Sequence, residues 1–380
     1  MRFKIERDYL VSSVSDVMKA VSSRTTIPIL TGIKIVASDE GVTLTGSDSD
    51  ISIECFIPSE ENDKQIVEIS QMGSIVLQAR FFSDIVKKLP GDQVEIEVHD
   101  SLTTRIRSGS SEFNLNGLDP EEYPRLPEVE AQEGFQIQAD LLKNIIRQTV
   151  FAVSTSETRP VLTGVNWKLE DGELNCTATD SHRLALRTVK VEPNGNDLSF
   201  SNVVIPGKSL SELSKIIDDN EELVDITVTE NQILFKSNHI LFFSRLLDGN
   251  YPDTSRLIPN ESKTNVTVSA KELLQAIDRA SVLAREGRNN VVKLASLEES
   301  TLEISSNSPE IGKVIEQVQS HSFDGEELKI SFSAKYMMDA LRSMDSNEVN
   351  ISFTGAMRPF LIKPIEGAAI MQLILPVRTY

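Results

Sequence analysis

The sequence predicts an α+β protein built from three copies of one domain. Its 380 residues exceed what a single hydrophobic core usually serves, so two or three domains are expected. Residues 3–21, 135–153 and 266–284 share one pattern, a short alternating strand followed by a helix with apolar residues at helical spacing. Charged residues make up 25% of the chain and interleave with apolar ones, which is typical of folded domains.

Each copy continues with the same elements in the same order. A loop leads from the first helix into paired strands, expected over residues 42–57, 174–187 and, more weakly, 290–294 with 302–314. A second helix follows over residues 80–89, 209–217 and 335–344. In the first of these helices Phe81 is expected on the apolar stripe. Alternating strands then occupy residues 94–98, 226–235 and 349–353, so each copy has two helices and several antiparallel strands.

Proline-bearing turns separate the copies. Asp119–Pro124 and Asp248–Pro252 are similar in sequence and are natural linkers. We therefore expect domains at residues 1–127, 128–254 and 255–380. Open sheet edges invite pairing, and a symmetric dimer that joined the two ends of such an array would form a ring of six domains.

The charge distribution is uneven along the chain. A net charge of −19 argues against an ordinary nucleic-acid-binding surface. The six predicted helical segments nevertheless sum to +6 and the remainder carries −25, and five of the six segments are net positive. Helices on a common surface could face a polyanion through sparse phosphate contacts that ignore sequence. The alternative is that these lysines and arginines are ordinary solvated helix faces.

The chain shows no sign of export or membrane insertion. The N-terminus lacks the apolar core of a signal peptide, and no stretch approaches the ~20 apolar residues of a membrane span. Cys55 and Cys176 fit buried thiols in a reducing compartment better than a disulfide. These features predict a cytoplasmic protein.

No catalytic motif stands out, so neither an enzyme nor a cofactor is expected. The four histidines show no metal-binding spacing with one another or with cysteine. Gly207-Lys208-Ser209 follows a predicted strand, but Asn202 replaces the glycine that a phosphate loop requires.

One acidic pattern supports a rival hypothesis. Asp48, Asp50 and Glu54 alternate along an expected strand, so their carboxylates would share a face and could bind Mg²⁺ in an enzyme. A solvated strand face is the favoured interpretation, because no His or Lys constellation accompanies them. A third possibility is a scaffold that binds proteins through a groove and does not bind DNA.

Two features are expected to lack a counterpart in the first copy. Residues 370–377 are apolar almost to the end of the chain, so they must pack, either as a closing strand or as the wall of a groove. Pro376 ends the strand and leaves Val377 and Arg378 free to line a site. The second feature is the turn that contains His182 and Arg183.

Four strings carry a resemblance to a known family, in register with all three repeats. RTTIPILTG (24–32), ATDSHRLAL (178–186), LLDGNYPDTSRLIP (246–259) and LPVRTY (375–380) resemble the bacterial DNA polymerase III beta subunit, or beta sliding clamp. The resemblance implies three domains of the DNA-clamp fold and a six-domain ring formed by a head-to-tail homodimer. Such a ring encircles double-stranded DNA as a processivity factor, tethers replicative and repair polymerases, and associates with the nucleoid.

The same resemblance implies three sets of site residues. A hydrophobic pocket between the second and third domains would bind short linear motifs of DNA polymerases and the clamp loader. Its walls would be Leu162, Thr179, Ser181, His182, Arg183, Leu184, Pro252, Arg256 and Leu257 on one side, and Ser333, Tyr336, Met357, Pro359, Leu373, Leu375, Pro376, Val377 and Arg378 on the other. Within it, Arg183 and Arg378 are expected to hold a partner's backbone or carboxylate. Arg24, Arg80 and Arg159 would contact DNA, and Val282 and Leu283 would meet the first domain of the partner subunit. Family members often have glycine in place of Ser181 and methionine in place of Leu375 and Val377, so the detailed shape of this pocket is expected to differ.

Overall fold

The computed structural model describes residues 1–23, 25–99, 101–126, 134–194, 198–217, 222–285 and 290–378. The chain forms two compact units. Unit 1 comprises Met1–Asp140, Pro193–Asn196 and Ser211–Leu246, and unit 2 comprises Leu141–Glu192, Asp197–Leu210 and Leu247–Tyr380. The first repeat lies in unit 1, the third lies in unit 2, and the second contributes to both.

The strand and helix that open each repeat are confirmed. They are β1 (Arg2–Glu6) with α1 (Arg7–Val17), β12 (Gly134–Gln138) with α3 (Ala139–Thr149), and β21 (Thr264–Ser269) with α5 (Ala270–Ala284). The apolar stripe faces the core in each helix whose packing is described in full, as with Leu10 and Val14 in α1 and Leu273 and Ile277 in α5. Periodicity therefore identified these elements correctly.

A second helix is also present in each repeat, directly after a strand. The pairs are β8 (Gly73–Gln78) with α2 (Ala79–Val86), β17 (Phe200–Pro206) with α4 (Gly207–Leu213), and β26 (Lys329–Ser333) with α6 (Ala334–Ser343). The prediction was wrong about Phe81, which is 55% exposed, whereas Phe82 is buried. Successive helical residues are ~100° apart, so only one of two adjacent rings can face the core. The second of these helices is also shorter than expected, and Ile216 and Ile217 are buried beyond its end.

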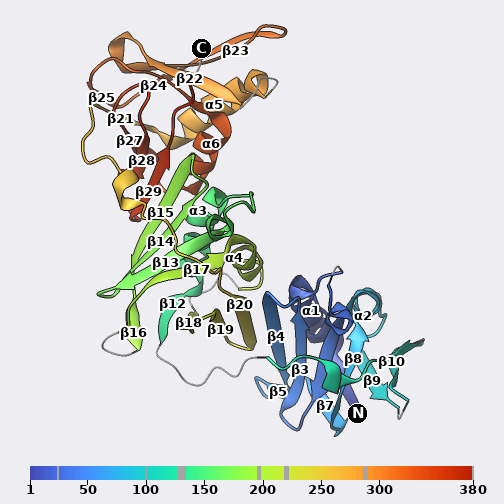
Figure 1. Cartoon of the computed structure of the whole chain (residues 1–380). Coiled ribbons are helices and arrows are strands. Elements are labelled where there is room, and N and C mark those ends of the chain that lie inside the picture. Colours follow the sequence, from blue (N-terminus) through green and yellow to red (C-terminus); the bar gives the residue numbers. More distant parts are fainter. Residues whose placement is uncertain are drawn as a thin grey trace. The chain divides into compact units, whose positions relative to one another are not determined.

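Two large sheets run through unit 1 (Figure 1). The first has the order β11-β10-β9-β1-β7, and its further strands are β11 (Ser111–Asn116), β10 (Thr103–Ser108), β9 (Gln93–Val98) and β7 (Val67–Gln71). The second contains β12-β18-β19-β20-β4-β3-β2-β8, with β18 (Leu223–Val228), β19 (Gln232–Ser237), β20 (Ile240–Arg245), β4 (Ile51–Pro58), β3 (Gly41–Ser47) and β2 (Gly32–Ala37). A short hairpin, β5 (Glu60–Glu61) and β6 (Lys64–Gln65), follows β4. Because β20 pairs with β4, a strand of the second repeat extends a sheet of the first. The single strand expected over residues 226–235 is in fact two, β18 and β19.

Unit 2 repeats this plan. A nine-stranded sheet has the order β17-β13-β14-β15-β29-β28-β27-β21-β25, with β13 (Gly164–Glu170), β14 (Glu173–Thr179), β15 (Arg183–Lys190), β29 (Ile370–Ile374), β28 (Phe360–Pro364), β27 (Glu348–Phe353) and β25 (Ser322–Gly325). A four-stranded sheet has the order β24-β23-β22-β26, with β24 (Gly312–Gln319), β23 (Thr301–Ser308) and β22 (Val291–Ser296). The rings of Phe332, Phe353 and Phe360 make tilted contacts with one another in the core of this region. Again a strand of one repeat pairs with a strand of the next, β15 with β29.

Both cysteines are free and buried, as predicted. Burial raises the pKa of each thiol far above its ordinary value, so neither is reactive. None of the helices in the described part of the chain is long and apolar enough to cross a membrane.

Candidate functional site

The antiparallel pairing of β15 with β29 sorts the predicted site residues onto two faces. Arg183 lies opposite Ile374, and Leu184 lies opposite Leu373. Side chains alternate along a strand, so Leu184 and Leu373 point to one side of the sheet and Arg183 to the other. Register alone therefore separates the apolar residues of the site from its buried arginine.

An apolar floor covers the Leu184 face. Leu184, Leu361, Met371 and Leu373 form a buried cluster, and Leu186 and Ile258 pack against it, partly buried. Beside Ile258, the 3-10 turn Ser255–Leu257 presents Leu257, which is 52% exposed. Exposed apolar atoms next to a buried apolar cluster offer a place where a partner's apolar side chain can dock.

The polar turn that connects β14 to β15 borders this apolar floor. The Asp180 carboxylate accepts hydrogen bonds from the backbone N–H groups of His182 (2.9 Å) and Arg183 (3.0 Å). Ser181, between them, has a φ of 75°, the left-handed conformation that favours glycine. The His182 carbonyl accepts a hydrogen bond from the N–H of Leu375 (2.9 Å). The turn and the C-terminal segment are thus held together, with the side chains of Ser181 and His182 exposed.

Arg183 is held by several contacts within the protein. Its buried guanidinium pairs with Asp180 (3.0 Å) and Asp339 (2.7 Å) and donates to the carbonyl of Phe151 (2.5 Å). It also lies over the Tyr336 ring, 4.4 Å from the centroid. The role expected for Arg183, holding a partner's backbone or carboxylate, fits this arrangement poorly, because the side chain is buried and three of its five N–H groups already donate within the protein. Arg183 instead positions the turn and Tyr336.

The C-terminal segment both closes a sheet and lines a hollow, so both open expectations for it are met. β29 joins the nine-stranded sheet, and beyond it the N–H of Val377 donates to the carbonyl of Ser331 in β26 (2.7 Å). The hollow has a volume of about 460 Å³. Lys293, Lys329, Ile330, Ser331, Ala356, Met357, Val377 and Arg378 line it. Met357 is 53% exposed there, and Arg378 is exposed as well.

The remaining residues expected in the pocket are either buried beneath it or located at the surface. Leu162, Thr179 and Ser333 are buried, and the Thr179 hydroxyl donates to the Arg183 carbonyl (2.6 Å). Leu375, Pro376 and Pro359 are half-buried, whereas Pro252 and Arg256 are exposed. Sequence reasoning missed Tyr251, whose hydroxyl oxygen accepts a hydrogen bond from the Thr179 N–H (2.9 Å). Burial raises the pKa of the Tyr251 hydroxyl, so it stays neutral and supports the turn.

Comparison with known proteins decides the family. The DNA polymerase III beta subunit models match in chain order, the N-terminal domain over residues 1–127, the central domain over 136–253 and the C-terminal domain over 255–378. The chain belongs to the DNA polymerase III beta subunit family. The beta sliding clamps of Bacillus subtilis and Staphylococcus epidermidis are 69% and 54% identical to it, each over the full length of both chains.

Solved clamp structures agree with this assignment. The crystal structure of the DNA polymerase sliding clamp from Bacillus subtilis matches with a TM-score of 0.97, and the beta chain from Streptococcus pneumoniae with 0.94 at 41% identity, each covering both chains fully. The expected α+β fold of three clamp domains is confirmed. The protein functions as a DNA sliding clamp, a processivity factor in replication, and is not an enzyme.

Three of the residues expected to touch DNA or a second clamp subunit, Arg80, Arg159 and Val282, are exposed. Arg24 falls outside the described residues. Arg80 is exposed near the start of α2, and Arg159 is exposed just before the 3-10 turn Pro160–Thr163. On α5, Val282 is 61% exposed and Leu283 is half-buried.

The carboxylates of the rival enzyme hypothesis do not share a strand face. Asp48 and Asp50 lie in the turn before β4, where Asp48 accepts hydrogen bonds from the N–H groups of Asp50 (3.1 Å) and Ile51 (2.9 Å). Only Glu54 lies on the strand, half-buried, and burial raises the pKa of its carboxyl. The prediction failed because Ser49 is left-handed (φ 79°) and forms a tight turn. Among the described residues, no group of three or more His, Cys, Asp or Glu side chains could hold a metal ion.

Proposed function

We propose that this clamp works as a head-to-tail homodimeric ring around double-stranded DNA, and that its β15–β29 junction binds short linear motifs of DNA polymerases and the clamp loader. The domains would span residues 1–127, 128–254 and 255–380, in line with the family matches. We place the ring in the cytoplasm, associated with the nucleoid. The observation that carries the binding site is the apolar floor of Leu184 and Leu373 beside the exposed Leu257.

Two sheet edges support the ring. Among the described strands, β11 ends the five-stranded sheet of the first repeat and β24 ends the four-stranded sheet of the third. Phe113 on β11 and Ile315 on β24 are both exposed. An open, apolar edge favours pairing with another edge, and pairing β11 of one subunit with β24 of the next would close a two-fold ring. α5 packs against β24, so Val282 and Leu283 would lie at the same interface.

Sparse charge on the helices supports loose contact with DNA. Helices pack in pairs within the first and third repeats, α1 with α2 and α5 with α6. Arg80 and Arg159, together with Arg24, would contact phosphates without reading sequence. Retention would then come from encirclement, which explains how a chain of net charge −19 can remain on a polyanion.

The pocket would recognise its partners mainly through apolar contact. Aliphatic or aromatic anchors of a motif would rest on the Leu184 floor, against Leu257 and Met357. Arg378 is exposed beside the hollow and would hold the motif's backbone or a carboxylate. Leu162, Thr179, Arg183 and Tyr336 would keep the walls in place.

A topological experiment tests the ring. The protein is loaded by its clamp loader on nicked circular DNA, and half of the sample is then linearised at high salt. We expect retention on the circle and loss from the linear DNA, because a ring slides off a free end. Equal loss from both substrates would contradict encirclement, since that is how an ordinary phosphate-binding protein behaves.

A second experiment tests the pocket. We expect the double variant Leu257→Ser with Met357→Ser to shorten the products of polymerase extension on primed circles while retention of the ring is unchanged. Leu297→Ser, an exposed leucine away from these walls, serves as the control. Full product length with the double variant would exclude this surface as the polymerase site.

A further inference from the structure

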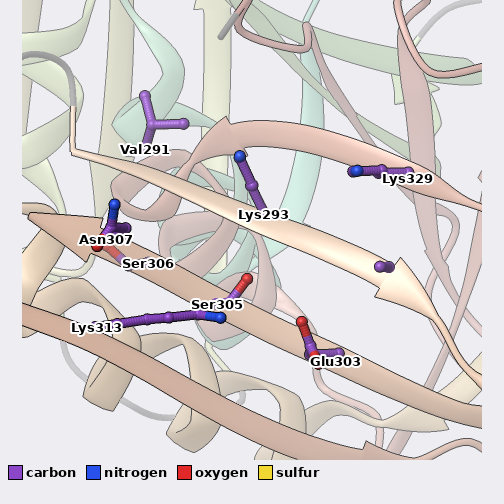
Figure 2. Close-up of a pocket in the computed structure, with 9 residues that line it drawn as sticks. Val291, Lys293, Glu303, Ser305, Ser306, Asn307, Lys313 and Lys329 are labelled. Carbon is purple, nitrogen blue, oxygen red and sulfur yellow. The ribbon is translucent and has the colours of Figure 1, made fainter.

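Three lysines form a diagonal strip on the outer face of the four-stranded sheet of unit 2. Lys329 of β26, Lys293 of β22 and Lys313 of β24 line a shallow hollow of about 540 Å³ (Figure 2). All three side chains are exposed, and none makes an ion pair among the residues that the structure describes. Free lysines grouped on one face stand out in a chain of net charge −19.

Strand register fixes the geometry of this lysine strip. Lys329 lies opposite Ala295, Lys293 lies opposite Ser305, and Lys313 lies opposite Asn307. Each lysine is therefore displaced by two residues along the strand relative to the previous one, and all three point to the same face. With strands ~4.8 Å apart and ~3.3 Å per residue, the strip is roughly 20 Å long, the reach of about six extended residues.

The strip is continuous with the pocket assigned above. Lys293 and Lys329 also line the hollow that contains Met357, Val377 and Arg378. The hydrogen bond from Val377 to Ser331 joins the C-terminal segment to β26, the strand that carries Lys329. A chain leaving the pocket past Arg378 can thus run onto the lysines, because Lys293 and Lys329 line both hollows.

The lining matches carboxylates better than nucleic acid. Ser305 and Asn307 add hydrogen-bond donors between the lysines, and Glu303 is the one carboxylate among the residues that line the hollow (Figure 2). None of the lining residues is aromatic, so there is no platform on which bases could stack. Exposed lysines in high dielectric favour many weak charge contacts, which suits a flexible acidic peptide.

We propose that the lysine strip binds an acidic segment of about six residues that flanks the apolar motif held in the pocket. This inference rests on the proposed pocket and adds a charge preference to it: partners whose motif continues into glutamate or aspartate would bind more tightly than partners whose motif does not. Competition among partners for one clamp would then depend on ionic strength as well as on the apolar anchor.

Labelled synthetic peptides test the proposal on the full-length protein. One carries only an apolar anchor of leucine and phenylalanine, and two others extend it with alternating Glu-Ser or Gln-Ser. We expect the Glu-Ser peptide to bind about tenfold more tightly than the Gln-Ser peptide at low salt, with the difference lost at high salt. In the triple variant Lys293→Gln, Lys313→Gln, Lys329→Gln the two should bind equally, and Glu303→Gln should increase the preference.

Controls separate the possible failures. The triple variant Lys4→Gln, Lys64→Gln, Lys236→Gln removes the same charge from exposed positions in unit 1 and should keep the preference. Replacing the three strip lysines with arginine should also keep it, and thermal unfolding checks that each variant is folded. If the anchor peptide alone fails to bind, the proposed pocket is wrong. If it binds but glutamate adds nothing, or if a single-stranded oligonucleotide and not the acidic peptide depends on the three lysines, the acidic-segment proposal is overturned.

Discussion

At the scale of single residues, an arginine side chain has different roles in buried and in exposed surroundings. Arg183 is buried between two carboxylates and an aromatic ring, whereas Arg256, only a few positions beyond the linker, is exposed and pairs loosely with Asp253 (3.6 Å). The sequence suggested one role for both, contact with a partner. Burial decides the difference, because a guanidinium out of water must be paired inside the protein.

Removing the buried guanidinium should therefore be costly. We expect Arg183→Ala to lower the free energy of unfolding by about 3 kcal/mol, because it leaves the Asp180 and Asp339 carboxylates unpaired in a largely buried site. Urea unfolding followed by circular dichroism measures this. Arg256→Ala, which loses only an exposed pair, should cost less than about 1 kcal/mol. Equal losses in the two variants would show that burial does not govern these ion pairs.

The turn at Ser181 gives a prediction of the opposite sign. Ser181→Gly should raise the free energy of unfolding by about 0.5–1 kcal/mol, because a φ of 75° strains serine but not glycine. Ser74→Gly, at an extended position near the start of β8, should instead destabilise the protein by a similar amount. Thermal or urea unfolding compares the two. A destabilised Ser181→Gly would mean that its side chain, and not its backbone, matters to the turn.

At the scale of elements, sheet edges are better candidates than helix faces for association with another subunit. Among the described strands, β11 and β24 end their sheets with unpaired backbone groups and exposed apolar side chains. In α1, α2, α5 and α6, by contrast, the buried apolar residues pack inside the protein, and a helix has no unpaired backbone edge to extend. An association surface is therefore expected at the edges.

Charge placed on an edge should weaken the dimer. We expect Ile315→Lys to raise the dimer dissociation constant by about ten- to a hundredfold, since an apolar contact at the centre of an interface typically contributes 1–3 kcal/mol. Analytical ultracentrifugation over a concentration series measures the shift. Leu223→Lys, an exposed leucine on β18, should leave the constant unchanged. An unchanged dimer in both variants would place the interface elsewhere.

At the scale of the whole molecule, the three repeats are not independent. β20 of the second repeat pairs with β4 of the first, and β15 of the second pairs with β29 of the third. Neighbouring repeats therefore share main-chain hydrogen bonds and apolar surface as well as a linker. Shared sheets make it costly for one repeat to unfold while its neighbour stays folded.

Calorimetry can detect this coupling. We expect the full chain to unfold in fewer than three transitions, because the shared sheets join the repeats. Asp345→Ala, which removes the exposed pair with Arg147 (2.6 Å) in unit 2, should leave the number of transitions unchanged. Three well-separated transitions, one for each repeat, would show that the linkers and not the sheets connect the repeats.

Much of this protein follows from periodicity and local chemistry. The repeats, the order of most of their strands and helices, and the buried cysteines were predicted correctly, because each depends on a pattern within a few residues. The failures concern side-chain direction and turn geometry. Phe81 was assigned to the core but points to solvent, and Asp48 and Asp50 were assigned to a strand face but lie in a tight turn. Arg183 was expected to hold a partner, and its guanidinium is buried among partners within the protein.

The structure also corrects the view that the His182 turn has no counterpart in the first repeat. Asp48-Ser49-Asp50 and Asp180-Ser181-His182 have the same backbone, with an aspartate that accepts two N–H groups and a left-handed serine. Only what surrounds the turn differs. In the second repeat, the segment after β29 bonds to His182, and Asp339 of the third repeat pairs with Arg183.

The sequence by itself determined the threefold α+β repeat, the sign of the charge on its helices and the apolar end of the chain. Only the tertiary structure decided that residues almost 200 positions apart, such as Leu184 and Leu373, form one floor, and that three lysines from different strands form one strip. The physical reason is register. Hydrophobic spacing specifies which residues leave water, but strand pairing between distant segments specifies which of them meet.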